Sequence, residues 1–162
     1  MKAIVNADNN WGIGFGDKLI NYIPADMKFF KETTTGNVVV MGRATFMTFP
    51  GPKALPNRVN IVLTTDENWN APDVTVCHSV DELFGVLKNY DTDTVYVIGG
   101  SSVYEQLLPY CDTAYVTKVD TSKEADKYFP DLDSDPEWSI EDAGEIMEHN
   151  GTEFRFMKYT RR

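Results

Sequence analysis

The sequence predicts an α/β fold: a single domain with a mostly parallel central sheet, helices on both faces of the sheet and a C-terminal antiparallel hairpin. Three observations lead to this prediction. Several strand-like segments are continuously apolar, which is typical of strands covered on both faces. Helical patterns alternate with these strands. Near the C-terminus, two strand-like segments follow one another with Asn150-Gly151, a strong hairpin turn signal, between them.

Each expected strand is a short apolar segment. In order, these segments are KAIVNA (2–7), NVVVMG (37–42), VNIVLT (59–64), VTVCH (74–78), TVYVIGG (94–100) and TAYVTKV (113–119). Helical patterns cover residues 24–35, a short segment after Arg43, and residues 80–90 and 102–109. Pro24 suits the first turn of the first helix, whose end we expect near Gly36. The segments WSIED and EFRFMKYT are the expected hairpin strands. The acidic, proline-containing segment 130–137 predicts a surface loop.

Length and composition fit one domain that spans residues 1–162, because 42% of the residues are hydrophobic. The N-terminus turns polar after a few residues, and no apolar segment approaches the ~20 residues that cross a bilayer. We therefore expect no signal peptide, no membrane association and a cytoplasmic location. Cys77 and Cys111 show neither metal-type spacing nor a disulfide framework, so we expect both to be packing residues.

The formal net charge of −10 argues against a nucleic-acid partner, because phosphate binding needs clustered Lys and Arg. The same charge opposes small anionic ligands. An anion site on this chain would have to be built from a few local cations and backbone amides. We expect a monomer and no metal.

Asp26 lies in the segment INYIPADMKFF, at the start of the first expected helix. At about 100° per residue, it falls on the apolar arc that also holds Ile23, Met27 and Phe30. One interpretation is an acid that complements the helix dipole with its head in water. The other is a carboxylate buried for a chemical purpose, and the helix alone does not separate the two.

Two glycine-containing segments adjoin strands. Gly99-Gly100 follows a buried strand and precedes Ser101 or Ser102, which we expect to cap the next helix, so the turn is either a phosphate site or an ordinary βα turn. The segment WGIGFGDKL (11–19) lacks the G-x-G-x-x-G spacing of dinucleotide-binding proteins. Its glycines predict a pliable connection, either a plain loop or one that moves over a ligand.

Three polar residues sit beside expected strands. Arg43 follows a strand at a helix start, where it could grip a phosphate or stay solvated. Arg58, behind a Pro-Asn turn, could clamp a carboxylate or stay in water. Thr117 would face inward from a strand, which β-propensity explains without a further role.

Together these segments resemble dihydrofolate reductases, and the likeness covers the whole chain. The segments that carry it are IPADMKFF, VVVMGRATF, LPNRVNIVL, VIGGSSVYEQLLP and DKYFP, in family order and spacing. The resemblance implies NADPH-dependent reduction of 7,8-dihydrofolate to 5,6,7,8-tetrahydrofolate by hydride transfer to the pteridine ring. It also implies that antifolate inhibitors bind.

The resemblance implies roles for individual residues. Asp26 and Thr117 would be the catalytic pair, with the pKa of a walled-in Asp26 raised by desolvation. Substrate-binding positions would be Val5, Asn6, Asp26, Met27, Phe30, Phe49, Leu55, Arg58, Ile98 and Thr117. Cofactor-binding positions would be Asn6, Ile13, Gly14, Gly42, Arg43, Ala44, Thr45, Leu63, Thr64, Thr65, His78, Ile98, Gly99, Gly100, Ser101, Ser102, Val103 and Tyr104. The peptide between Gly99 and Gly100 would be cis.

The chain departs from the family pattern at several positions. Many members carry Pro-Trp before the catalytic helix, where this chain has Ile20-Asn21. Positions where the family often carries a cation near the 2′-phosphate are Ala44, His78 and Ser102 here. We therefore expect only a modest preference for NADPH over NADH.

Two other functions fit the same fold. One is a reductase of the riboflavin-pathway type, acting on a ribosylated pyrimidine. The other is a non-catalytic protein that binds folate or a nucleotide, since a fold alone does not guarantee activity. Asp26 argues against the second, because a binding protein has little need of a buried proton-relay carboxylate.

Overall fold

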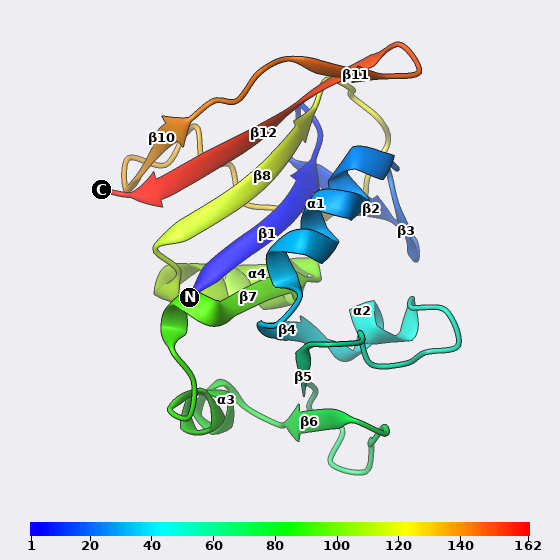
Figure 1. The fold of residues 1–162 in the computed structure, drawn as a ribbon, viewed down its shortest axis with the longest axis vertical. Coiled ribbons are helices and arrows are strands. Elements are labelled where there is room, and N and C mark those ends of the chain that lie inside the picture. Colours follow the sequence, from blue (N-terminus) through cyan, green and yellow to red (C-terminus); the bar gives the residue numbers. More distant parts are fainter.

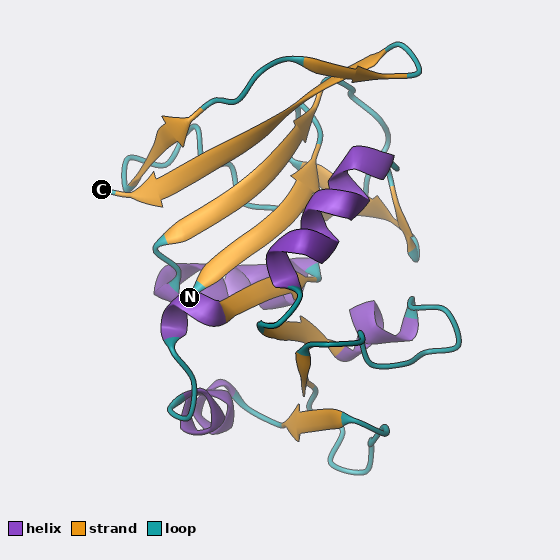
Figure 2. Ribbon diagram, viewed as in Figure 1, coloured by secondary structure: helices purple, strands orange, loops and turns teal.

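The computed structural model describes all residues 1–162, which form one large sheet with two helices on each face (Figures 1 and 2). The helices are α1 (Pro24–Thr34), α2 (Arg43–Met47), α3 (Val80–Leu87) and α4 (Ser101–Leu107), with short 3-10 helices at Thr92–Thr94 and Leu108–Tyr110. The strands are β1 (Lys2–Ala7), β2 (Gly12–Phe15), β3 (Lys18–Leu19), β4 (Val38–Gly42), β5 (Val59–Leu63), β6 (Val74–Cys77), β7 (Val95–Gly99), β8 (Thr113–Val119), β9 (Lys127–Tyr128), β10 (Trp138–Asp142), β11 (Met147–His149) and β12 (Thr152–Arg161).

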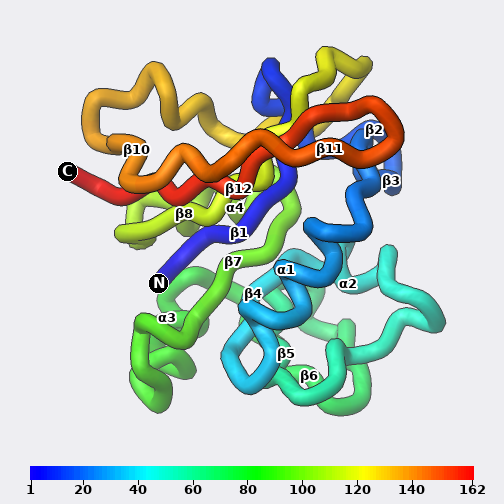
Figure 3. The backbone as a smooth tube through the Cα atoms, turned by 45° about the horizontal axis from the view of Figure 1, so that its top comes forward, coloured from blue at the N-terminus to red at the C-terminus, as the bar shows by residue number.

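The sheet runs in the order β10-β12-β8-β1-β7-β4-β5-β6, with β11 paired to β12. Neighbours from β8 to β6 are parallel, whereas β12 pairs antiparallel with β8, β10 and β11. The predicted fold class is therefore confirmed. Backbone bonds join Asp112 to both Met1 and Arg161, so the two chain ends lie near the same end of β8 (Figure 3).

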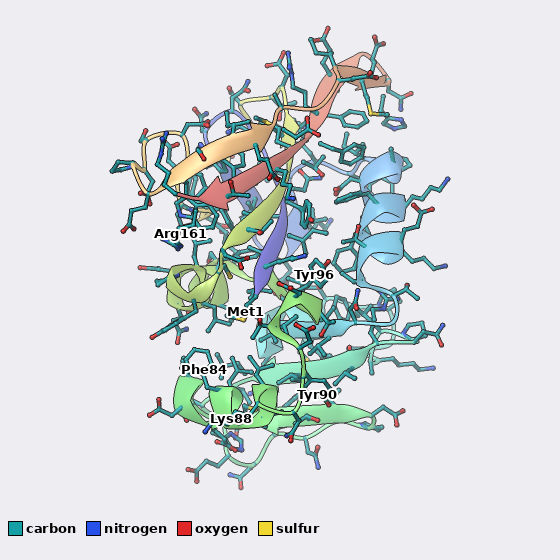
Figure 4. The ribbon with its side chains drawn as sticks, turned by 60° about the vertical axis from the view of Figure 1, so that its left-hand side comes forward. Met1, Phe84, Lys88, Tyr90, Tyr96 and Arg161 are labelled. Carbon is teal, nitrogen blue, oxygen red and sulfur yellow. The ribbon has the colours of Figure 1, made fainter.

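Alternation along the strands separates two cores. In β4, Val38 and Val40 belong to a large cluster with Leu83 of α3 and Leu107 of α4. Met1 belongs to the same cluster. Phe84 of α3 and Tyr90, which follows the helix, pack against this cluster (Figure 4). The intervening residues of β4 face the other way, where α2 packs on the sheet.

The other face also carries α1, whose Phe29 ring lies 6.1 Å from that of Tyr115 and 4.9 Å from that of Phe156. Pro24 occupies the first turn and the helix ends at Thr34, close to the expected boundaries. The arc that contacts the sheet buries Asp26 and Thr34. Met27, which the helical period puts on the apolar arc, stays 39% exposed.

The segment 11–19, whose glycines predicted a pliable connection, contains regular strands. It forms β2 and β3, which join β9 in a small sheet of order β3-β2-β9. Gly12 permits this close pairing, because a Cβ there would lie 2.9 Å from Cβ of Ala125. Asp126, next to β9, accepts hydrogen bonds from the Gly16 amide at 3.1 and 3.2 Å, which fixes the segment further.

Several element ends differ from the sequence-based boundaries. Gly100, not a serine, is the N-cap of α4, without a capping side chain, because the glycine turn leads directly into the helix. Ser79 caps α3 by accepting a bond from the Glu82 amide, and the expected helix 80–90 ends at Leu87. The C-terminal turn does lie at Asn150-Gly151, both with positive φ, but it joins β11 to β12, and β10 pairs farther along β12.

Cys77 and Cys111 are both free and buried, as expected of packing residues.

Candidate active site

The site is built around Asp26, which is 7% exposed in the first turn of α1. Two strand residues hold its carboxylate. Thr117 of β8 donates from Oγ1 to Oδ1 at 2.6 Å, and Asn6 of β1 donates from Nδ2 to Oδ2 at 3.1 Å. Asn6 and Thr117 are partners in the parallel register of β1 and β8, so their side chains leave the sheet side by side toward α1. Three segments distant in sequence thus converge on one carboxyl group.

Burial raises the pKa of Asp26 above its ordinary value, and the hydrogen bonds from Thr117 and Asn6 oppose the rise without cancelling it. No cation contributes to the shift. The head of Asp26 is therefore not turned to water, and the second interpretation of this residue is the one that the structure supports. Such a group can hold or release a proton closer to neutral pH than an exposed aspartate.

A cation lies at the other end of α1. Arg58 donates from Nη1 to Thr34 Oγ1 at 3.1 Å and from Nε to the Pro56 carbonyl at 2.9 Å. Thr34 is eight residues beyond Asp26, or about 12 Å along a helix that rises 1.5 Å per residue. The face of α1 thus separates a protonatable acid from a guanidinium, an arrangement suited to an elongated ligand with an anionic tail.

Asn60 is a positioning residue that the sequence did not reveal. Its buried side chain accepts a bond from the Leu55 amide and donates to the Leu55 and Arg58 carbonyls, at 2.9 to 3.1 Å. It thereby shapes the loop that carries Arg58. An asparagine inside an apolar strand segment was the available signal, since a buried amide needs partners.

The carboxyl ends of β4 and β7 meet beside this face, and the helix starts that follow them lie close together. Met41 and Gly99 are paired in the sheet, and the Gly99-Gly100 peptide is cis. A Cβ at Gly42 would lie 3.1 Å from Val103 Cγ2, and one at Gly100 would lie 3.3 Å from Thr45 Oγ1. The glycines therefore let the two helix starts lie close together, with backbone and no side chain at these positions.

Two nearby side chains, those of Arg43 and His78, already have partners. Arg43 donates from Nη1 to Asp66 Oδ2 at 3.0 Å, and its guanidinium lies 5.9 Å from the Trp69 ring centre. His78 places Nδ1 3.0 Å from the Thr64 carbonyl. Arg43 and Asp66 both remain partly exposed, so the pair is accessible to a phosphate.

Some expected site residues present only their backbone to this face. Val5 belongs to the large core cluster on the opposite face of the sheet, as does Val103. Tyr104 is buried in that cluster and donates from its hydroxyl to the Ile4 carbonyl at 2.6 Å. The remaining pocket-wall positions, Phe49, Leu55 and Ile98, pack against the small cluster around Phe46.

Asn21, at the position of the family tryptophan, is 3% exposed and bonded inward. Its Nδ2 donates to Thr121 Oγ1 at 2.9 Å, and its backbone carbonyl accepts a hydrogen bond from Asn6 Nδ2 at 3.1 Å. The substitution therefore fills the position with a hydrogen-bonded polar side chain in place of an aromatic ring.

Nothing else in the chain offers a comparable centre. No buried side-chain nitrogen or oxygen lacks a hydrogen-bond partner, and no three His, Cys, Asp or Glu side chains are grouped to hold a metal ion. None of the helices has the length and apolar character that a bilayer crossing requires.

Known proteins share both the sequence and the fold. The family described as dihydrofolate reductase matches residues 1–161. A dihydrofolate reductase of Staphylococcus haemolyticus is 34% identical over 163 residues, covering 99% of this chain and 95% of that protein. One from Bacillus subtilis is 32% identical over 157 residues, covering 96% and 90%.

Among solved structures, a dihydrofolate reductase from Enterococcus faecalis, complexed with NADP(H) and RAB-propyl, is 38% identical with a TM-score of 0.86. The match covers 99% of this chain and 95% of that one. The likeness thus runs through every element that positions Asp26, Arg58 and the glycine turns, and the chain belongs to the dihydrofolate reductase family.

Proposed function

We propose that the chain reduces 7,8-dihydrofolate to 5,6,7,8-tetrahydrofolate with NADPH, and that Asp26 is the group that manages the proton. The observation that carries this assignment is a carboxyl group 7% exposed, held by two neutral donors and with a raised pKa. Reduction of a carbon–nitrogen double bond adds a hydride to the carbon and a proton to the nitrogen. NADPH supplies the hydride, and the protein must favour the proton.

Asp26 binds the pteridine and favours its protonated form. An ionised carboxylate has about four lone-pair sites, of which Thr117 and Asn6 occupy two. The others remain for N–H groups of the ring. Because the carboxyl group is buried, bonds from a ligand to it are stronger than in water and hold the ring in one orientation.

Arg58 binds the anionic tail of the substrate. Its Nε and Nη1 are bonded to neutral oxygen acceptors, which orient the guanidinium without neutralising it. Phe30, Phe49, Leu55 and Ile98 supply the apolar walls between the two polar ends. We assign Met27 to the rim because it is 39% exposed.

NADPH would bind across the carboxyl ends of β4 and β7. The fit rests on the absence of side chains at Gly42 and Gly100, where a Cβ would come within 3.1 Å of Val103 Cγ2 or 3.3 Å of Thr45 Oγ1. Arg43, Thr45, Thr64, Thr65 and His78 would hold the phosphates and the adenosine ribose, and residues 99–102 the central phosphates. β2 would cover the nicotinamide through Ile13 and Gly14. We also propose that the protein acts as a cytoplasmic monomer and binds antifolate inhibitors.

Loss of NADPH absorbance in the presence of dihydrofolate tests the proposal. Turnover that needs both compounds supports it. A protein that binds both in calorimetry but turns over neither would be a non-catalytic binding protein. Turnover of a ribosylated pyrimidine in place of dihydrofolate would favour the riboflavin-pathway type of reductase.

A further inference from the structure

We propose that Asn6 is a positioning residue for catalysis: its side-chain amide fixes the Asp26 carboxylate and ties it to the segment that enters α1. The inference rests on the proposed role of Asp26. Asn6 itself need not touch a reacting atom. It acts through the carboxylate that it holds.

The geometry defines the orientation of the amide. Nδ2 of Asn6 lies 3.1 Å from Asp26 Oδ2 and 3.1 Å from the Asn21 carbonyl. An amide nitrogen carries two N–H donors, and here each has one acceptor. The flipped amide would place its oxygen against a carboxylate and a carbonyl, both acceptors only, so the chemistry excludes it.

Asn6 and Thr117 constrain the carboxyl group differently. The Thr117 hydroxyl can donate to an ionised Asp26 or rotate to accept a proton from the neutral acid. The Asn6 amide nitrogen can only donate. Asn6 therefore favours the ionised form and, when Asp26 is neutral, keeps Oδ2 as the acceptor, so that the proton resides on Oδ1 beside Thr117.

The contacts of Asn6 extend beyond the carboxylate. The Asn21 carbonyl that it binds belongs to a residue whose side chain donates to Thr121 Oγ1 at 2.9 Å. Thr121 follows the end of β8, the strand that carries Thr117. The bonds thus link the entry of α1 to both strands that hold Asp26, which limits movement of the helix start relative to the sheet.

A purely structural role is the competing explanation, since a polar residue inside a strand must be satisfied. The two explanations differ in one measurable respect. If Asn6 only fills its position, its removal lowers the stability but leaves the titration of Asp26 unchanged. If it holds the carboxylate, its removal raises the proton affinity of Asp26.

The first experiment is an NMR titration of the Asp26 side-chain carbon in the ligand-free protein, for wild type, Asn6→Ala and Asn6→Leu. Losing a donor to the charged form should increase the proton affinity roughly fivefold to tenfold, because bonds to charged groups exceed neutral ones by about that factor. The midpoint of the pH profile of kcat/KM should move to higher pH by the amount that corresponds to this change in proton affinity. Asn9→Ala, which removes a 2.8 Å bond from an asparagine amide to Asp120 on the surface, is the matched control and should shift neither.

Overlapping Asp26 titrations in wild type and Asn6→Leu would overturn the proposal. Should neither variant fold, the wild type decides: the Asn6 side-chain amide signals must change with pH at the Asp26 midpoint, and signals without that transition would contradict the inference. The titrations need no turnover. An upward shift in an inactive protein would therefore support the contact and count against the proposed function alone.

Discussion

Replacing Asp26 by asparagine removes the proposed proton-handling group with little change in shape. The variant can keep both internal bonds, because its carbonyl can face Asn6 Nδ2 while its amide donates to a rotated Thr117 hydroxyl. We therefore expect Asp26→Asn to fold. Any loss of activity then reflects the chemistry of the carboxyl group.

The expected loss has two contributions. Removing a general acid–base group lowers rates by about 10²-fold to 10⁴-fold. Bonds between the pteridine and a charged acceptor exceed those to a neutral one by about 1 kcal/mol, or roughly fivefold in affinity. We expect kcat/KM at neutral pH to fall by about 10³-fold, with partial recovery in acid, where dihydrofolate takes its proton from solvent.

The same substitution should stabilise the ligand-free protein at neutral pH. Since the folded-state pKa of Asp26 is raised above the ordinary value of 3.8, the folded state binds more protons than the unfolded state between these two values. The free energy of unfolding contributed by Asp26 therefore falls as the pH rises through that window, and stays lower above it. The uncharged amide of the Asp26→Asn variant has no such dependence, so the advantage of the variant vanishes in acid below the window.

Two assays check this account. Steady-state turnover with NADPH and dihydrofolate across pH gives the activity profile, and urea unfolding at several pH values gives the stability difference. A variant with the pH profile of the wild type, or one less stable at neutral pH and equally so in acid, would refute the reasoning.

Three further predictions concern other parts of the molecule. Asp66→Asn frees Arg43 from its 3.0 Å ion pair, so kcat/KM for NADPH relative to NADH should rise above the modest preference expected of the wild type; equal efficiency of both cofactors in the wild type would contradict that expectation. Phe46→Ala, at a side chain 1% exposed, should lower the free energy of unfolding by about 3–5 kcal/mol in urea titrations, whereas Phe15→Ala, at 48% exposure, should change it by less than about 0.5 kcal/mol. Raising the salt concentration should not greatly weaken NADPH capture in stopped-flow mixing. Salt screens the attraction of NADPH to local cations such as Arg43, but it also screens the repulsion by the net charge of −10. A collapse of the capture rate between low and moderate salt would show that attraction by the local cations dominates.

Periodicity predicted the elements that position the central acid. The continuous apolar segments indicated the central strands, and the helical period put Asp26 on the apolar arc with Ile23 and Phe30, although the period alone left open whether its carboxylate is buried. The inward direction of Thr117 also followed from strand alternation. These features depend on local sequence, where burial and period determine the structure.

The sequence could not predict features that depend on distant partners. β9 has only two residues and pairs with β2, a strand more than 100 residues earlier in the chain. The Asn6 contact joins residues 20 apart, and the Arg43 ion pair joins residues 23 apart. No local pattern shows that either side chain is engaged, since an asparagine in a strand or an arginine at a helix start is also compatible with solvent.

The two arginines proposed for the anionic ligands differ in how their charge is held, and this difference predicts where specificity is strong. Arg58 is oriented by a carbonyl and a hydroxyl, so its positive charge is uncompensated when a carboxylate arrives. Arg43 is neutralised by Asp66, so a phosphate must displace or share that partner and also approaches the Asp66 charge. Because like charges at short range reduce the gain from binding, the chain should distinguish substrates by their anionic tail more sharply than it distinguishes NADPH from NADH.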